Sequence, residues 1–131
     1  MGTGRIWLQL GFYKENKVRL NEYQLNSEKY AAYEKYSIKE SEIIPFLALG
    51  ITGEAGEIAN KIKKHIRGDY NILNQDSKAK EIALELGDVL WYVSELANCL
   101  GFTLDDIAKL NLEKLYLREQ NNTIQGDGDI R

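Results

Sequence analysis

The stretch LGITGEAGEIANKIKKHIRG, residues 49–68, carries the periodicity that decides the fold. Pro45, just before it, is tolerated only in or near the first turn of a helix, and Gly68 at its end is a natural C-cap. Between these two residues, apolar side chains recur at helical spacing: Phe46, Leu49, Ile51, Ile58, Ile62 and Ile66. The pattern predicts an amphipathic helix over about residues 42–67.

The same stretch contains residues that weaken a helix. Glu54 and Glu57 are three positions apart and share a face, a like-charge contact that costs about 0.2–0.5 kcal/mol. Gly53 and Gly56 lie beside them, and an interior glycine costs about 1 kcal/mol relative to alanine. A stable helix with this composition therefore requires a compensating interaction.

A second predicted helix, over about residues 77–100, has the same combination. Its apolar positions follow three- and four-residue steps and stop at Gly101: Ile82, Leu86, Val89, Val93, Leu96 and Leu100. Glu85 and Asp88 are again three apart, with Gly87 between them. Two helices thus combine acidic pairs with interior glycines.

The chain contains two further helical segments. A partial stripe of leucine and tyrosine predicts a helix over about residues 20–36, and Thr103 followed by Asp106 resembles a capping box that opens a helix over residues 104–120. No window alternates with period two, so we expect an all-α fold. Long helices joined by short loops predict an antiparallel four-helix-type bundle, completed by oligomerisation, with any site facing its interior.

Length and composition indicate one folded domain. The 131 residues suffice for a single core, and we expect residues 1–19 to be an N-terminal extension preceding a domain at 20–131. A net charge of -3 argues against a general nucleic-acid binder. We expect no membrane partner, because no apolar run is long enough to span a bilayer and no signal peptide is evident. The single cysteine, Cys99, which we expect to be buried, indicates a reducing compartment, so we expect a cytoplasmic protein.

The four carboxylates Glu54, Glu57, Glu85 and Asp88 predict a metal site. Acidic side chains from two adjacent antiparallel helices supply the oxygen ligands that Mg²⁺ prefers, with Mn²⁺ as a substitute, and a bound ion would turn repulsion into ligation. The glycines beside them would let a neighbouring helix or a phosphate approach this face. For either pair alone, a solvated helix face is the alternative interpretation.

Several polar side chains lie at helical spacing from these carboxylates. Lys61 is four residues after Glu57, so it could pair with that carboxylate or with a substrate phosphate. Tyr92 is four residues after Asp88 and could reach a ligand with its hydroxyl. The last helix carries a polar ladder, for which exposed surface is an equal alternative: Asn111, Lys114 and Arg118.

The chain resembles the MazG-like nucleotide pyrophosphohydrolases of the all-α NTP pyrophosphatase superfamily over about residues 20–131. The resemblance is carried by GITGEAGEIANKIKK, ELGDVLWYVSELANCLG, NLEKLYLR and the terminal GDGDIR, together with the opening LNEYQ. The paired E-x-x-E and E-x-x-D motifs are moderately specific alone. The added GDVLWY and GDGD-x-R make the match strong. Residues 1–19 have no counterpart in this pattern.

The resemblance implies a Mg²⁺-dependent enzyme that cleaves a nucleoside triphosphate between its α and β phosphates, releasing pyrophosphate. It implies a homodimer or a dimer of dimers, with a task in nucleotide-pool housecleaning. The four carboxylates would be metal ligands, and Glu54 or Glu57 would act as the catalytic base. The substrate contacts would be Lys61, Tyr92, Asn111, Lys114 and Arg118.

Two alternatives remain open at the level of sequence. One keeps the chemistry and changes the substrate to phosphoribosyl-ATP, whose pyrophosphohydrolase shares this helical plan. The other is a non-catalytic helical interaction module whose acidic face docks a basic partner. Nucleotide turnover would separate the second alternative from the enzyme, and a comparison of substrates would separate the first.

Overall fold

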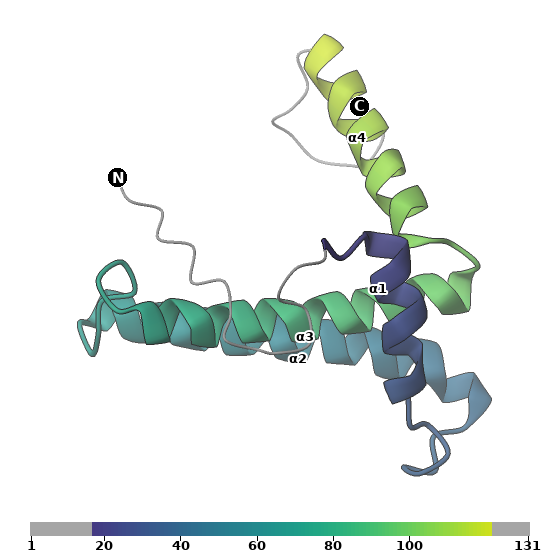
Figure 1. The fold of residues 1–131 in the computed structure, drawn as a ribbon, viewed down its shortest axis with the longest axis horizontal. Coiled ribbons are helices and arrows are strands. Elements are labelled where there is room, and N and C mark those ends of the chain that lie inside the picture. Colours follow the sequence, from purple (N-terminus) through teal and green to yellow (C-terminus); the bar gives the residue numbers. More distant parts are fainter. Residues whose placement is uncertain (1–16, 122–131) are drawn as a thin grey trace.

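A computed structural model describes residues 17–121 and forms four α-helices and one 3-10 helix. The two longest helices, α2 (Glu40–Arg67) and α3 (Asp76–Leu100), lie side by side as an antiparallel pair (Figure 1). Within this part of the chain no residue is in a strand. The all-α prediction is confirmed.

Helix α2 begins two residues earlier than the sequence predicts. The carboxylate of Glu42 accepts a hydrogen bond from the backbone N–H of Lys39 at 3.1 Å, which caps the first turn at Glu40. Pro45 consequently lies in the second turn rather than the first. The helix ends as predicted at Gly68, whose φ of 92° is the left-handed conformation of a glycine C-cap.

The boundaries of α3 also follow from local chemistry. The helix spans Asp76–Leu100, within one residue of the predicted start, and Gly101 closes it with a φ of 77°. The loop before it is held by His65, whose Nδ1 lies 3.1 Å from the carbonyl oxygen of Tyr70. Short capped connections of this kind bring α2 and α3 together as a hairpin.

The predicted helix over residues 20–36 is wrong in its second half. Helix α1 covers only Leu20–Ser27 and continues as the 3-10 helix η1, Glu28–Tyr30, after which residues 31–39 are not helical. Tertiary contacts outweigh helix propensity here, because the Tyr33 hydroxyl donates to the Glu95 carboxylate on α3 at 3.3 Å. Ser37, with a φ of 55°, turns the chain into α2.

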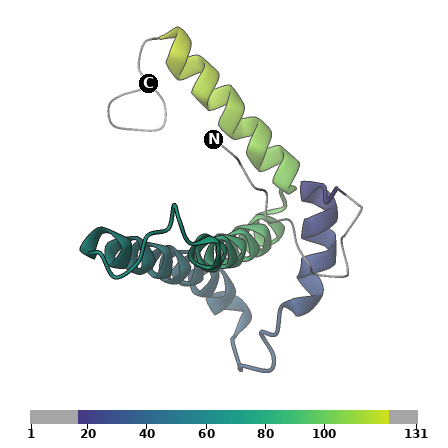
Figure 2. The ribbon, with the colours of Figure 1, turned by 60° about the vertical axis from the view of Figure 1, so that its left-hand side comes forward.

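Helix α4, Leu104–Gln120, starts at the predicted capping box. The Thr103 hydroxyl accepts from the Asp106 backbone N–H at 3.1 Å, and the Asp106 carboxylate accepts from the Thr103 N–H at 3.0 Å. The helix then points away from the α2–α3 hairpin, which Figures 1 and 2 show from two directions. Within one chain α4 does not lie beside the hairpin, so the predicted bundle, which was to be completed by oligomerisation, stays a prediction.

The buried centre lies where α1 crosses the hairpin near the start of α4. Its apolar side chains with less than a tenth of their surface exposed are few among the described residues: Leu47, Ala97 and Leu104. Polar side chains share this centre, and Gln24 binds three groups at once: its amide nitrogen donates to Asn98 Oδ1 at 2.6 Å and to the Phe102 carbonyl at 3.0 Å, while its oxygen accepts from the Leu104 N–H at 2.8 Å. Gln24 thereby fixes α1 to the beginning of α4.

Many large apolar side chains remain exposed in the isolated chain. Leu49, Ile66 and Leu112 are 72%, 78% and 67% exposed. Cys99, near the end of α3, is also exposed, which contradicts the burial expected for it. None of the helices in residues 17–121 combines the length and apolarity needed to cross a membrane.

Candidate metal-binding site

Three of the four predicted carboxylates meet between α2 and α3. Glu54 on α2 and Glu85 and Asp88 on α3 each offer an oxygen, and these oxygens lie within 4.8 Å of one another. The antiparallel pairing explains why these oxygens lie close together. Because the two helices run in opposite directions, residues in the middle of α2, such as Glu54, lie opposite residues in the middle of α3, such as Glu85 and Asp88. Glu54 and Glu85 are half-buried and Asp88 is exposed, so the group opens from the helix contact toward solvent.

The electrostatics of this group favour a cation. Partial burial raises the pKa of the Glu54 carboxyl above its usual range, and the charges of Asp88 and Glu85 raise it further. The Tyr92 hydroxyl has a raised pKa from burial and from the charges of Glu54 and Asp88. Negative charge is thus concentrated at one place, and a bound cation would relieve the repulsion.

Glu57 does not join the group of three. It is exposed, whereas Glu54 one turn before it is half-buried. The half-buried stripe of α2 runs through Gly50, Glu54, Ile58 and Lys61, and Glu57 lies at the edge of that stripe. Its predicted roles as a ligand and as a base stay predictions.

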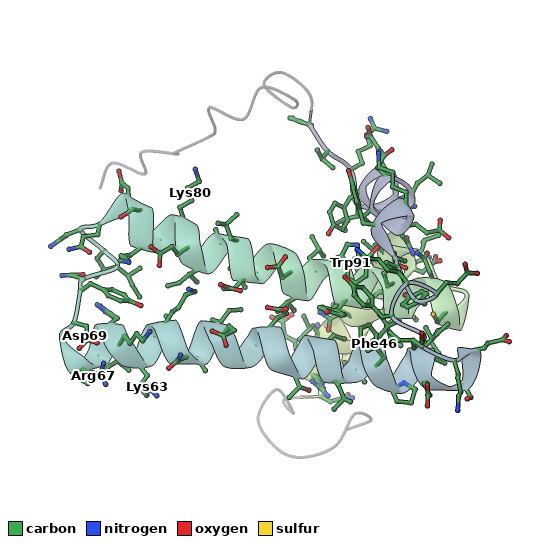
Figure 3. All side chains as sticks on the ribbon, turned by 90° about the horizontal axis from the view of Figure 1, so that it is seen from below. Phe46, Lys63, Arg67, Asp69, Lys80 and Trp91 are labelled. Atoms are coloured by element: carbon green, nitrogen blue, oxygen red, sulfur yellow. The ribbon has the colours of Figure 1, made fainter. Side chains whose placement is uncertain are left out.

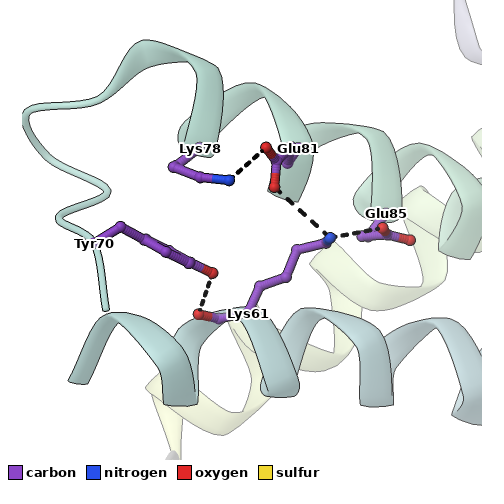
Figure 4. Close-up of polar contacts among 5 residues, drawn as sticks. All are labelled: Lys61, Tyr70, Lys78, Glu81 and Glu85. Atoms are coloured by element: carbon purple, nitrogen blue, oxygen red, sulfur yellow. Dashed lines mark hydrogen bonds and ion pairs between the residues drawn. The ribbon is translucent and has the colours of Figure 1, made fainter. Parts of the chain in front are cut away.

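Lys61 connects the two helices through ion pairs (Figure 4). Its ammonium lies 3.4 Å from Glu85 Oε1 and 3.9 Å from Glu81 Oε2. Glu81 in turn binds Lys78 at 2.8 Å. The carboxylates that pair with Lys61 therefore come from α3, not from Glu57 on its own helix.

Tyr92 packs directly against the backbone of α2. A Cβ placed on Gly50 would overlap the Tyr92 ring, so only glycine admits the ring at this depth. Phe46 and Trp91 contact the same ring edge-on, with centroids at 6.3 Å and 5.0 Å. Figure 3 shows Phe46 and Trp91 near the end of the hairpin that α1 crosses. An aromatic wall therefore borders the acidic group.

The explanation expected for the other glycines is not supported within the chain. A Cβ at Gly53, Gly56 or Gly87 would meet no atom within 4 Å, so these residues do not mark a close approach between helices of one chain. Gly50, which the periodicity did not single out, has that role. An approach by a phosphate to the other three stays a prediction.

The predicted contacts on α4 lie apart from the acidic group. Asn111 is exposed, while Lys114 and Arg118 are half-buried and each takes part in an interaction. Because α4 points away from the hairpin, one chain does not bring these residues to Glu54 and Glu85 (Figure 2). The terminal GDGDIR and residues 1–16 of the predicted extension lie outside the described part of the chain.

Two contributors were missed in the sequence. Glu81 is four residues before Glu85, so Glu81, Glu85 and Asp88 follow one face of α3, and this spacing could have revealed a third acidic position. Gly50 is four residues before Glu54 and shares its face in the same way. In both cases the residue lies four positions before a predicted metal ligand, and this spacing places it on the same helix face.

The residues present fit a hard divalent cation. Three carboxylates from two helices form an oxygen-only set with room for water ligands on its exposed side, which is the coordination that Mg²⁺ prefers over a complete protein cage. No cysteine or histidine belongs to the group, so its donor set does not suit a softer metal. Glu54, Glu85 and Asp88 would hold the ion.

Comparisons with known proteins agree with this picture. Residues 46–123 match the family model of the MazG nucleotide pyrophosphohydrolase domain. The chain is 43% identical over 90 residues to the gene 37 protein of Mycobacterium phage L5, covering 69% of this chain and 78% of the phage protein. It is 31% identical over 83 residues to the uncharacterized protein YvdC of Bacillus subtilis, covering 60% of this chain and 78% of that protein.

No solved structure gives a significant match. The family match spans more than half of the chain, and it includes α2 from Phe46 onward, all of α3 and α4, and thus the three converging carboxylates. The resemblance noted from the motifs is confirmed. This chain belongs to the MazG nucleotide pyrophosphohydrolase family.

Proposed function

We propose that the protein is a Mg²⁺-dependent nucleoside triphosphate pyrophosphohydrolase that releases a nucleoside monophosphate and pyrophosphate. The observation that carries the proposal is the convergence of Glu54, Glu85 and Asp88 within 4.8 Å, in a chain of this family. A role in nucleotide-pool housecleaning and a cytoplasmic location belong to the same proposal.

In this proposal the carboxylates have two roles, which are to bind the metal ion and to accept a proton. Mg²⁺, when bound, would neutralise phosphate charge and acidify a water molecule. Glu54, Glu85 and Asp88 would hold the ion, with Glu57 as a further ligand, and Glu54 or Glu57 would accept a proton from the attacking water. Tyr92 offers a hydroxyl beside the group, and Lys61 offers an ammonium to a phosphate oxygen.

The proposal includes a homodimer or a dimer of dimers. Helix α4 leaves its own hairpin and exposes several large apolar side chains, of which Leu112, Tyr116 and Leu117 are 67%, 60% and 57% exposed. A second copy would cover this surface and would bring Asn111, Lys114 and Arg118 near the acidic group of its partner. Obligate interfaces are apolar in this way.

The test is an incubation of the purified protein with Mg²⁺ and a panel of deoxy- and ribonucleoside triphosphates, with phosphoribosyl-ATP included. We expect pyrophosphate as the product, and no turnover after chelation of the metal. Orthophosphate as the product, or no turnover of any substrate, would contradict the proposal.

A variant links this activity to the site. Asp88→Asn removes one charge from the group and should lower kcat by about a hundredfold or more, because a ligand to the ion is weakened. The variant should unfold at the same temperature as the wild type or higher, since the repulsion is reduced. Full activity of Asp88→Asn would remove the basis of the assignment.

A further inference from the structure

We propose that Lys61 is an internal counter-cation that occupies Glu85 when no metal is bound and releases it when a divalent ion binds. Lys61 therefore sets the affinity of the site for the ion. This inference rests on the proposed function, because it requires the acidic group to be a metal site.

The geometry places Lys61 in competition for a metal ligand. Its ammonium lies 3.4 Å from Glu85 Oε1, and only 22% of the lysine side chain and 20% of the glutamate side chain are exposed. Glu85 also offers an oxygen to the group with Glu54 and Asp88. The same carboxylate thus faces a resident cation and the space that an ion would take.

Elementary electrostatics give the direction of the effect. An ammonium beside Glu85 reduces the negative charge that the site presents, and it would repel a doubly charged ion a few ångströms away. Binding of the ion therefore includes the cost of weakening the Lys61–Glu85 pair. Removing the ammonium should tighten binding, even though Lys61 is itself expected to help bind a phosphate.

Glu81 gives Lys61 a second partner. It lies 3.9 Å from the lysine ammonium on the side away from Asp88, one helical turn along α3, and it also binds Lys78 at 2.8 Å (Figure 4). When Glu85 turns to an ion, Glu81 can keep Lys61 paired. Glu81 is therefore a positioning residue for Lys61, which holds the ammonium at the edge of the site instead of in bulk solvent.

The experiment is a calorimetric titration of the metal-free protein with Mg²⁺ and with Mn²⁺, without nucleotide. For Lys61→Met we expect binding tighter than wild type by on the order of tenfold, because a competing charge is gone. Lys61→Arg keeps the charge and should stay near wild type. Lys63→Met removes the same charge from the opposite side of α2, where Figure 3 shows Lys63 pointing away from α3, and should change binding little.

A double-mutant cycle tests the part played by Glu81. Glu81→Gln should weaken ion binding in the wild-type background, because Lys61 then has only Glu85 as a partner. In the Lys61→Met background the same substitution should have a smaller effect, and the difference measures the coupling. Equal effects in the two backgrounds would show that Glu81 acts only through its charge, and would overturn its positioning role.

The outcomes separate this inference from the proposed function. If the wild type binds the ion and Lys61→Met binds it equally or more weakly, the inference is wrong while the metal site stands. If neither protein binds an ion without nucleotide, the inference is wrong, and the turnover assay decides the proposed function separately. Tighter ion binding by Lys61→Met supports the inference, and a lower kcat of the same variant supports the predicted contact with phosphate. Circular dichroism of each variant is the control that shows whether the helices persist.

Discussion

The contact between Gly50 and Tyr92 brings an aromatic ring of α3 directly against the backbone of α2. The ring occupies the space where a side chain on α2 would begin, and Phe46 and Trp91 limit its movement. The position of the Tyr92 hydroxyl beside Glu54 and Asp88 depends on this fit. Gly50 lowers the intrinsic stability of α2, but its missing side chain lets the Tyr92 ring pack against the helix backbone.

Gly50→Ala should lower the stability of the protein by about 1–3 kcal/mol, because the added methyl group overpacks the contact. It should also lower activity by moving Tyr92. Gly53→Ala is the matched control: its Cβ meets open space, so it should raise stability by up to about 1 kcal/mol. Thermal unfolding of both variants is the measurement, and a stabilised Gly50→Ala would contradict the fit.

Glu95 is a buried carboxylate, 3% exposed, beneath α1. Burial raises its pKa above the ordinary 4.5, while hydrogen bonds from Tyr33 and Asn98 oppose the shift. A group with a raised pKa contributes stability that is fully present below its unfolded pKa and is lost as the pH rises through its folded pKa. Glu95 therefore favours the folded state more in acid than at neutral pH.

Glu95→Gln removes this titration. The difference in melting temperature, wild type minus variant, should fall as the pH rises from 4.5 through the raised pKa of the carboxyl. The wild type alone is not informative, because carboxyls with lowered pKa values, such as that of Asp106, act in the opposite direction. A difference that is constant with pH would contradict the role of Glu95.

Sequence reasoning predicted that four carboxylates converge, and the structure brings three of them together, while the role of Glu57 stays a prediction. Helical spacing puts Glu54, Glu57, Glu85 and Asp88 on facing helices, and three of them meet. The spacing does not say which of two neighbours faces the partner helix, because the rotation of α2 is set by packing at Leu47 and Gly50. The pairing of Lys61 with α3 was missed for the same reason.

At the scale of elements, ends were easier to predict than contacts. Gly68, Gly101 and the Thr103 capping box were identified because the chemistry of a helix end is local. The break after Tyr30 was not, because it depends on the Tyr33–Glu95 and Trp91–Ser27 hydrogen bonds across more than sixty positions of chain. The direction of α4 was not predicted either, because no local signal in the sequence determines it, and the bundle completed by oligomerisation stays a prediction.

The capping box at the start of α4 allows a matched test of this local chemistry. Thr103→Ala should cost about 1 kcal/mol, since the Asp106 N–H loses its acceptor. Thr52→Ala makes the same change inside α2, where the hydroxyl only bonds back to the Ala48 carbonyl, and should cost little or stabilise the helix slightly. Chemical denaturation of the two variants compares them directly. An equal decrease in the free energy of unfolding for the two variants would contradict the stabilising role of the cap.

At the scale of the whole molecule, the exposed apolar surface is the dominant feature. Only three apolar side chains in the described residues are buried, whereas most of the large ones on α4 after Leu104, and several on the hairpin, are exposed. So much exposed apolar surface is the observation that supports the proposed second copy.

Leu112→Glu combined with Tyr116→Glu tests that proposal. The two residues are one turn apart on α4 and are 67% and 60% exposed. Charge on this face should shift the protein from a dimer or larger assembly to a monomer, measured by light scattering after gel filtration, with loss of most activity. Leu73→Glu, in the loop at 85% exposure, is the control that should leave the assembly unchanged. An unaltered mass of the double variant would place the interface elsewhere.

The hairpin connection has a consequence for what a separate monomer could do. The acidic oxygens and Lys61 come from two consecutive helices, and the last of these residues is Asp88, well before α4 begins at Leu104. The proposed metal ligands therefore belong to the α2–α3 hairpin alone, whereas the proposed contact with a second copy belongs to α4. If both proposals hold, a separate monomer would still bind the ion, whereas turnover would require two copies.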